Sequence, residues 1–244
     1  MMDTIGIALA IFLGLVHIFA DRIRRLCHIP PCWWMSIAGG VSTAYIFLDV
    51  FPELGESQLE LEPVIGPLFG YLEHHVYLLA LVGLGLFYGL EKLAVRSRRH
   101  RHKMQGEDWT GPGVFWVHTL SFASYSAILG YLLQEMEDHG LGSTLLLFIA
   151  LALHFIVNDV GLREHHQRAY DRLGRWILAG AIVSGWLLGQ AIEVSAAAIA
   201  ATWALVSGGI ILNVLKEELP ENQESHFGAF AGGALIYALL LLVV

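Results

Sequence analysis

The residues most suited to bind a ligand or to take part in a reaction lie together in one apolar stretch, LALHFIVNDVGLREHH, at positions 151–166. His154 and Asn158 are four residues apart, so they share one face of a helix, and Asp159 is turned about 100° further round. A neutral imidazole beside amide and carboxylate oxygens suits Zn²⁺ or a similar divalent cation. The alternative is that these side chains only make hydrogen bonds between helices, which is the commoner role of a single histidine in a membrane.

A second histidine, His118, is expected at a similar depth on the preceding helix. A helix that begins at Gly111 and one that ends near Val160 each place their histidine roughly 10 Å from the same membrane face, by helical rise. An ionisable side chain inside hydrocarbon is costly unless it is paired, hydrated or bound to a metal, so Asp159 needs a partner or a water-filled cavity. We therefore predict a cation site between these two helices.

The elements that must position these residues are membrane helices. The chain is 56% apolar and only 15% charged, with a mean hydropathy of +0.60, which lies outside the usual range of soluble domains. Apolar runs long enough to cross about 30 Å of hydrocarbon occur at 4–20, 33–51, 71–95, 111–133, 141–160, 173–192, 196–215 and 227–243. We predict an all-α, polytopic membrane protein of eight transmembrane helices that form a single domain, 1–244. We expect it in a cell membrane, either a plasma membrane or a bacterial inner membrane.

Basic residues are confined to the odd-numbered connections between these runs. The first connection has three arginines, the third has six basic residues between Lys92 and Lys103, the fifth has four arginines, and the seventh has Lys216. The even-numbered connections carry acidic residues instead. By the positive-inside rule the odd connections are cytoplasmic, so both termini are predicted to lie outside.

The second and seventh helices contain a repeated pattern. The second reads GGVSTAYIFLDVFPE and the seventh reads GGIILNVLKEELPE, and the two helices are predicted to run in opposite directions. This favours an inverted 3+2+3 repeat, with 1–95 matched to 161–244 and with 96–160 supplying a basic loop and the central helix pair. The alternative is that Gly-Gly only permits close helix packing and that Pro-Glu only marks a helix end.

Further acidic residues lie at the predicted ends of this path. Asp49 and Glu53, four residues apart at the outer end of the second helix, could collect a cation, although a solvated helix end is an equal alternative. Glu217 and Glu221 repeat this spacing at the inner end. The segment 164–166, Glu-His-His, is predicted to follow the fifth helix into the cytoplasm and could receive a released ion. The histidines in the basic third loop fit a contact with anionic lipid better than a metal site.

These features together resemble the ZIP family of divalent-metal transporters. The shared features are eight helices, both termini outside, a basic third loop that contains histidine (RSRRHRHK), the Pro-Glu ends of helices two and seven, and a histidine-led motif on helix five. The resemblance covers nearly the whole chain in layout. It implies that the protein carries zinc, or sometimes iron or manganese, into the cytoplasm between its repeats, with ligands mainly from helices four and five.

The motifs that carry this resemblance depart from the family pattern. Helices four and five of the family have the forms H-N-x-x-[DE]-G and H-[DE]-x-x-[HE]-[EG]. In this chain HFIVND has Phe155 where a carboxylate is expected, and HTLSFA matches only at His118, with Thr119 and Phe122 at the other positions. The carboxylates of the family motifs, which this chain lacks at these positions, are the groups that would hold a second metal ion. The resemblance therefore implies one weaker site and not a binuclear centre.

We therefore expect a transporter, and not an enzyme, whose substrate is a divalent metal ion with zinc as the best candidate. The expected metal-contacting residues are His118, His154, Asn158, Asp159, Asp49, Glu53 and Glu217. The expected partners are the metal ion and the lipid bilayer, not nucleic acid, with a homodimer as an open alternative. A second hypothesis is a transport-inactive metal sensor or scaffold. A third is an intramembrane zinc hydrolase, which is disfavoured because His165 and His166 should fall more than a turn below the other histidines.

Overall fold

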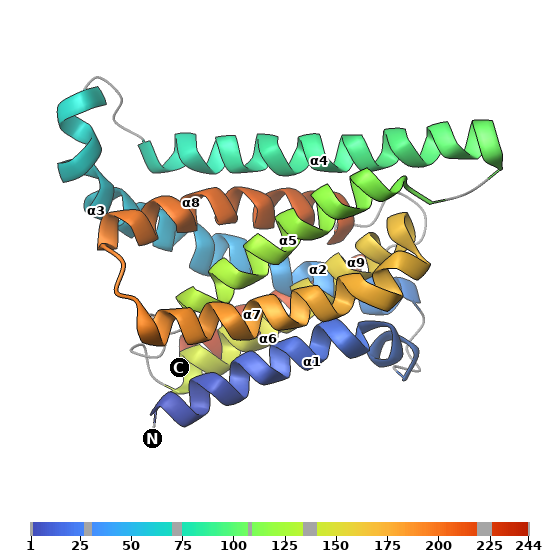
Figure 1. The fold of residues 1–244 in the computed structure, drawn as a ribbon. Helices are drawn as coiled ribbons and strands as arrows, with labels where there is room; N and C mark the ends of the chain where they lie inside the picture. Colours follow the sequence, from blue (N-terminus) through green and yellow to red (C-terminus); the bar gives the residue numbers. More distant parts are fainter. Residues whose placement is uncertain are drawn as a thin grey trace. The chain divides into compact units, whose positions relative to one another are not determined.

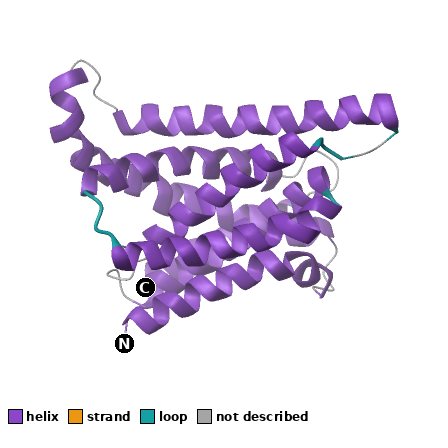
Figure 2. Cartoon of the chain, in the orientation of Figure 1, coloured by secondary structure: helices purple, strands orange, loops and turns teal. Residues whose placement is uncertain are grey.

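The computed structural model of the chain describes residues 2–26, 31–69, 75–106, 109–133, 141–218 and 226–243. All regular structure within these ranges is helical, so the all-α prediction is confirmed for the part of the chain described (Figure 2). The α-helices are α1 (Met2–Leu26), α2 (Pro31–Tyr45), α3 (Phe51–Phe69), α4 (His75–Gln105), α5 (Pro112–Leu132), α6 (Leu141–His166), α7 (Arg175–Ala191), α8 (Ala196–Asn213) and α9 (Phe227–Val243). The described residues also form the short π-helices η1 (Ile46–Val50) between α2 and α3, η3 (Tyr170–Gly174) before α7, and η4 (Val214–Glu218) after α8.

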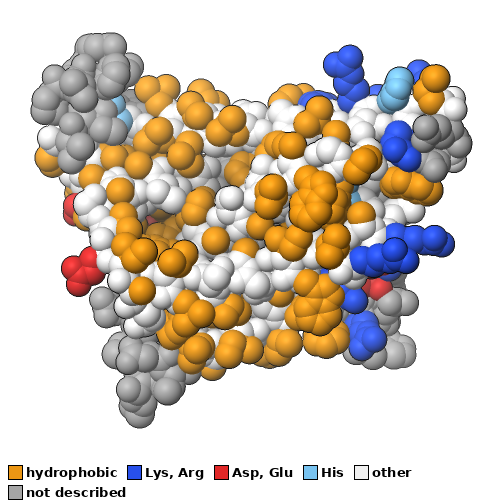
Figure 3. Space-filling view, in the orientation of Figure 1, with side chains coloured by type: hydrophobic (Ala, Val, Ile, Leu, Met, Phe, Trp, Pro, Cys, Tyr) orange, Lys and Arg blue, Asp and Glu red, His pale blue; other side chains and the backbone are white. Residues whose placement is uncertain are grey.

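Four helical stretches among the described residues are long and apolar enough to cross a membrane. They are Ser36–Pro63, His75–Met104, Thr144–His166 and Ala196–Lys216, and α9 contains a shorter apolar helix, Phe227–Leu242. Hydrophobic side chains also cover much of the face seen in Figure 3. Length and composition thus mark the chain as a membrane protein. The number of spans, eight in the sequence analysis, remains a prediction.

The predicted end of the second helix at Pro-Glu is wrong. Helix α3 continues past Pro52, although proline has no N–H and its ring meets the backbone one turn earlier. The wide π turn η1 lies immediately before it, where the Phe51 N–H bonds to the Ile46 carbonyl five residues earlier. This wider turn accommodates the proline inside a continuous helix. The matching residues of the seventh helix, Pro220 and Glu221, lie outside the described residues.

The basic third segment is helical and does not form the predicted loop. Helix α4 continues to Gln105, beyond the predicted end at Val95. Arginine and lysine are good helix formers, and no glycine or proline interrupts them before Gly106. Gly106 has a φ of +69°, a conformation that commonly ends a helix. The basic side chains of this segment are therefore arranged on a regular helical surface.

The chain forms two compact units, each made of two separate stretches. Unit 1 consists of Met1–Ile29 and Gly89–Ala191, and unit 2 consists of Pro30–Tyr88 and Ile192–Val244. In unit 1, α1 packs against α6 and α7, and α5 packs against α7 (Figure 1). In unit 2, α2 packs against α9, and α3 packs against α8.

Three helix pairs within these units cross at reciprocal glycines. The pairs are α5 with α7 in unit 1, and α2 with α9 and α4 with α8 in unit 2. A Cβ atom on either glycine of a pair would lie only 1.9 to 2.4 Å from a backbone carbonyl oxygen of the partner helix. The glycine pairs are Gly130 with Gly185, Gly40 with Gly233, and Gly83 with Gly208. Small residues at a crossing allow two membrane helices to approach this closely.

Candidate functional site

The polar residues of helix α6 are buried inside unit 1. His154, Asn158 and Asp159 are 2%, 7% and 1% exposed, inside unit 1. Helix α6 packs against α1, and its Phe155, between these polar residues, is completely buried. Each polar side chain must therefore find its hydrogen-bond partners within the protein.

Asp159 is held by two side chains that the sequence analysis did not select. The Nδ1 atom of His17 on α1 lies 2.9 and 3.0 Å from the two carboxylate oxygens, and the Tyr170 hydroxyl donates to the same carboxylate. Burial is the main cause that raises the pKa of the Tyr170 phenol well above its usual value, and the nearby Asp159 carboxylate is the second. This hydroxyl therefore remains a donor. The His17 ring also stacks on Phe155, with ring centroids 4.4 Å apart. The signal for His17 was an ionisable residue within the first apolar run.

The second ring nitrogen of His17 has no hydrogen-bond partner among the described residues. This Nε2 atom is buried, and the whole side chain is only 1% exposed. A cavity of about 20 Å³ adjoins the same group and is lined in part by His17, Asp159 and Tyr170. A space of this size holds one water molecule or one ion. The histidine and carboxylate pair therefore borders a space that can take a single small ligand.

Ion pairs line this cavity on the side of Arg163. The Arg163 guanidinium lies 2.6 Å from Asp21 on α1 and 2.9 Å from Asp171 in η3, so two carboxylates offset its charge. The same three residues, with Glu164, help to line a larger hollow of about 480 Å³. The cavity is lined by two arginines, Arg163 and Arg175, and by the three aspartates 21, 159 and 171, so its surroundings are polar and not strongly cationic.

His154 and His118 make separate pairs. The Nε2 atom of His154 lies 2.9 Å from the hydroxyl of Tyr125 on α5. The Nδ1 atom of His118 lies 2.9 Å from Nε2 of His166, whose other ring nitrogen contacts the Thr110 hydroxyl. In the pair of His118 with His166 one nitrogen donates and the other accepts, according to the tautomer. The two predicted ligands are thus hydrogen-bonded to different partners.

The predicted common depth of His118 and His154 is wrong. His118 lies beside His166, because α6 continues as a helix to His166 and the two rings are hydrogen-bonded. His154 lies twelve residues earlier on α6, about 18 Å away along the helix axis. His166 therefore falls below His154, as predicted, but not below His118.

Of the expected exit segment 164–166, Glu164 is exposed and pairs with Arg98. His165 is half-buried, and its Nε2 lies 3.0 Å from Glu91.

The predicted ligands do not gather into one centre. His118 and His154 are connected along one face of α5 by the rings of Phe122 and Tyr125, with successive centroid distances of 5.1, 6.2 and 6.1 Å. Within the described ranges, no three or more His, Cys, Asp or Glu side chains form a group that could hold a metal ion. The structure instead places a series of hydrogen-bonded pairs through unit 1.

The remaining predicted residues belong to unit 2. Asp49 is half-buried in η1 and accepts a hydrogen bond of 3.0 Å from the Tyr237 hydroxyl on α9. Glu53 is exposed in the first turn of α3. Glu217 lies in η4, but its side chain is outside the described part of the structure.

Comparison with known proteins adds no further information about this site. No family model, no curated protein and no solved structure matches the chain. The fold and the site define a helical membrane protein with a buried histidine and carboxylate network, and the resemblance to a transporter family remains an expectation from the sequence.

Proposed function

We propose that the protein transports a divalent metal cation, zinc or a similar ion, across a membrane, as the resemblance to the ZIP family implies. The observation that carries this proposal is the Asp159 and His17 pair beside the cavity of about 20 Å³. Histidine and aspartate are rare inside membranes, where they commonly mark ion pathways. Two such residues from different helices, both almost fully buried, therefore favour an ion-handling role over packing alone.

The geometry of His17 supports metal binding by its free nitrogen. A histidine that binds a metal through one ring nitrogen usually donates the other N–H to a carboxylate, which fixes its orientation and tautomer. His17 has this arrangement, because Nδ1 lies at hydrogen-bond distance from Asp159 and Nε2 has no partner among the described residues. We assign His17 Nε2 as a binding atom and Asp159 as the group that orients it. The other predicted ligands of α6, His154 and Asn158, are not among the residues that line this cavity.

A small number of ligands fits a transported ion better than a stored one. Conduction requires binding that is weak enough to release the ion. Asp21, Arg163 and Asp171 line both the small cavity and the hollow of about 480 Å³, so the two spaces would form a polar route for the released ion. Under the positive-inside orientation this route opens to the cytoplasm, which is the proposed direction of transport.

The proposed architecture is the inverted 3+2+3 repeat in eight spans, with both termini outside. Two details of unit 2 support it. The π-helix η1 begins six residues after Gly40, and η4 begins six residues after Gly208, and each of these glycines lies at a helix crossing. Gly40 is the second glycine of its pair and Gly208 is the first, so the equal spacing holds for the glycines at the crossings and differs by one residue for the pairs. A crossing glycine followed at equal distance by a π turn favours a common origin of the two helices. The proposed location is a cell membrane.

A metal sensor or scaffold is the second candidate. It is favoured by one observation, the distribution of the histidines and Asp159 into pairs without a group of three ligands among the described residues. Such a protein would bind metal and would not release it across the membrane. A zinc hydrolase gains no support from the described residues, since it needs several ligands around one ion as well as a general base.

Zinc uptake into liposomes that contain a zinc-sensitive dye tests the proposal. We expect uptake by the wild-type protein, and a reduction of about tenfold or more in His17→Ala and in Asp159→Asn, because the binding atom or its orienting group is lost. His102→Ala, at an exposed position of α4, is the matched control and should retain uptake. Wild-type uptake by His17→Ala would refute the assigned site. Zinc binding without uptake would identify the sensor.

A further inference from the structure

Helix α4 carries a row of basic side chains on one face, within unit 1. Lys92, Arg96, Arg99 and Lys103 follow one another at spacings of four, three and four residues, which places them along one face of an α-helix for about 16 Å. All four side chains are exposed, and His100 lies beside them. The open space that they border measures about 780 Å³. We call these five residues the basic row.

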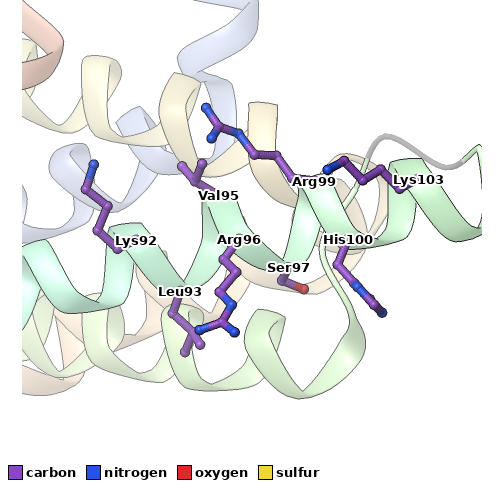
Figure 4. A pocket seen from close by; sticks show the side chains of 8 residues that line it. All are labelled: Lys92, Leu93, Val95, Arg96, Ser97, Arg99, His100 and Lys103. Atoms are coloured by element: carbon purple, nitrogen blue, oxygen red, sulfur yellow. The ribbon is translucent and has the colours of Figure 1, made fainter.

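Figure 4 shows how these side chains frame the helix surface. Lys92 and Arg99 extend to one side of the helix, and Arg96 and His100 extend to the other. The surface between them is open, and Lys and Arg side chains of unit 1 are prominent on the face seen in Figure 3. Cationic groups that spread to both sides of a helix can surround a small anion that approaches this surface.

The basic row is distinct from the other arginines of the same helical segment, which already have partners. Arg98 lies 3.3 Å from Glu164 of α6, and the Arg101 guanidinium lies 5.8 Å from the centre of the Trp109 ring. For Arg96, Arg99 and Lys103 the structure contains no ion pair or hydrogen bond within the described residues. The segment thus has one face that packs on unit 1 and another on which Arg96, Arg99 and Lys103 have no ion pair among the described residues.

The position of the row on α4 indicates which anion meets it. The same face of the helix, one to four turns earlier, presents Leu78, Leu81 and Tyr88, which are 42%, 61% and 46% exposed. Helix α4 is also the least buried of the candidate membrane spans. An exposed apolar face fits lipid tails, so the face becomes basic where the helix reaches the level of the lipid headgroups.

We propose that the basic row binds the phosphate headgroups of anionic phospholipids in the leaflet that surrounds the C-terminal half of α4. Arginine and lysine next to the end of a membrane span attract anionic lipid, and arginine can contact two phosphate oxygens at once. Under the positive-inside orientation this is the cytoplasmic leaflet. The inference concerns a surface of the protein that the proposed transport site does not use.

Spin-labelled lipids provide the test, with full-length protein reconstituted in phosphatidylcholine membranes. The association constants of spin-labelled phosphatidylglycerol and phosphatidylcholine are compared by electron spin resonance. We expect the wild type to prefer phosphatidylglycerol, and the variant Arg96→Gln, Arg99→Gln, Lys103→Gln to lose most of this preference. The row is exposed, so this variant should fold normally. High salt should weaken the wild-type preference in the same direction.

The matched control removes two arginines from the same segment. The variant Arg98→Gln, Arg101→Gln removes two positive charges where the triple variant removes three, and it leaves the basic row intact, so its preference for phosphatidylglycerol should remain close to that of the wild type. A loss in the double variant of about two thirds or more of that in the triple variant would show that only net charge matters and would overturn the assignment. An unchanged preference in the triple variant, or none in the wild type, would also overturn it, and so would a preference removed by soluble phosphate.

Discussion

The two units of the protein differ in what their helices bury. Among the described residues, unit 1 encloses Asp159 and four buried histidines, whereas the buried polar residues of unit 2 are four serines and His75. A buried serine can bond to a carbonyl of its own helix and costs little. A buried histidine or aspartate needs partners from other helices. Chemistry is therefore concentrated in unit 1, and close helix packing dominates unit 2, where two of the three glycine crossings lie.

The largest expected effect comes from the removal of the Asp159 carboxylate. Asp159→Ala leaves the His17 Nδ1 and Tyr170 hydroxyl groups buried without their acceptor, and we expect a loss of about 3 kcal/mol or more in the free energy of unfolding. Ser207→Ala in unit 2 is the comparison, since the Ser207 hydroxyl is buried without a partner among the described residues. It should change stability by less than about 1 kcal/mol. Denaturation in detergent measures both, and equal losses would remove the distinction between the units.

The next largest effect tests the packing of unit 2 with two neighbouring glycines of α9. A Cβ atom at Gly233 would lie 2.4 Å from the Ile37 carbonyl oxygen. A Cβ atom at Gly232 would meet no described heavy atom within 4 Å. We expect Gly233→Ala to destabilise the protein by about 1–3 kcal/mol, because α2 and α9 must separate. Gly232→Ala should be neutral or stabilising by up to about 1 kcal/mol, since alanine favours the helix. Thermal unfolding curves distinguish the two variants, and identical curves would contradict the crossing.

The smallest effect concerns the ion pairs beside the cavity of unit 1. Arg163 is partly exposed, so its pairs with Asp21 and Asp171 should stabilise the protein by only about 0.2–1 kcal/mol. We expect Arg163→Gln to lower stability by this amount at low salt and by less at high salt, because solvent ions screen exposed charges. Arg99→Gln, which removes no ion pair, should leave stability unchanged. A loss for Arg163→Gln that does not vary with salt would indicate that this arginine has a packing role.

Much of the helical structure follows from the sequence because it depends on short-range patterns. Apolar runs predicted most of each α-helix except α3, which lies almost wholly in the connection expected between 51 and 71. The polar residues of α6 were identified as buried from their position within such a run. Helix ends were less predictable. Pro52 was expected to end a helix, but the π turn before it lets the helix continue. The basic segment was expected to be a loop, but α4 continues through it to Gln105.

The partners of the buried residues were decided only by the tertiary structure. His17 and Asp159 are 142 residues apart in the chain, and His118 and His166 are 48 apart. The sequence by itself determined that the helices are apolar and that Asp159 needs a partner, since both depend on the transfer of side chains out of water. It did not determine which partner, because that depends on which helices pack together and on how far each is rotated about its axis. A rotation of one residue turns a side chain by about 100° and would take His17 away from the carboxylate.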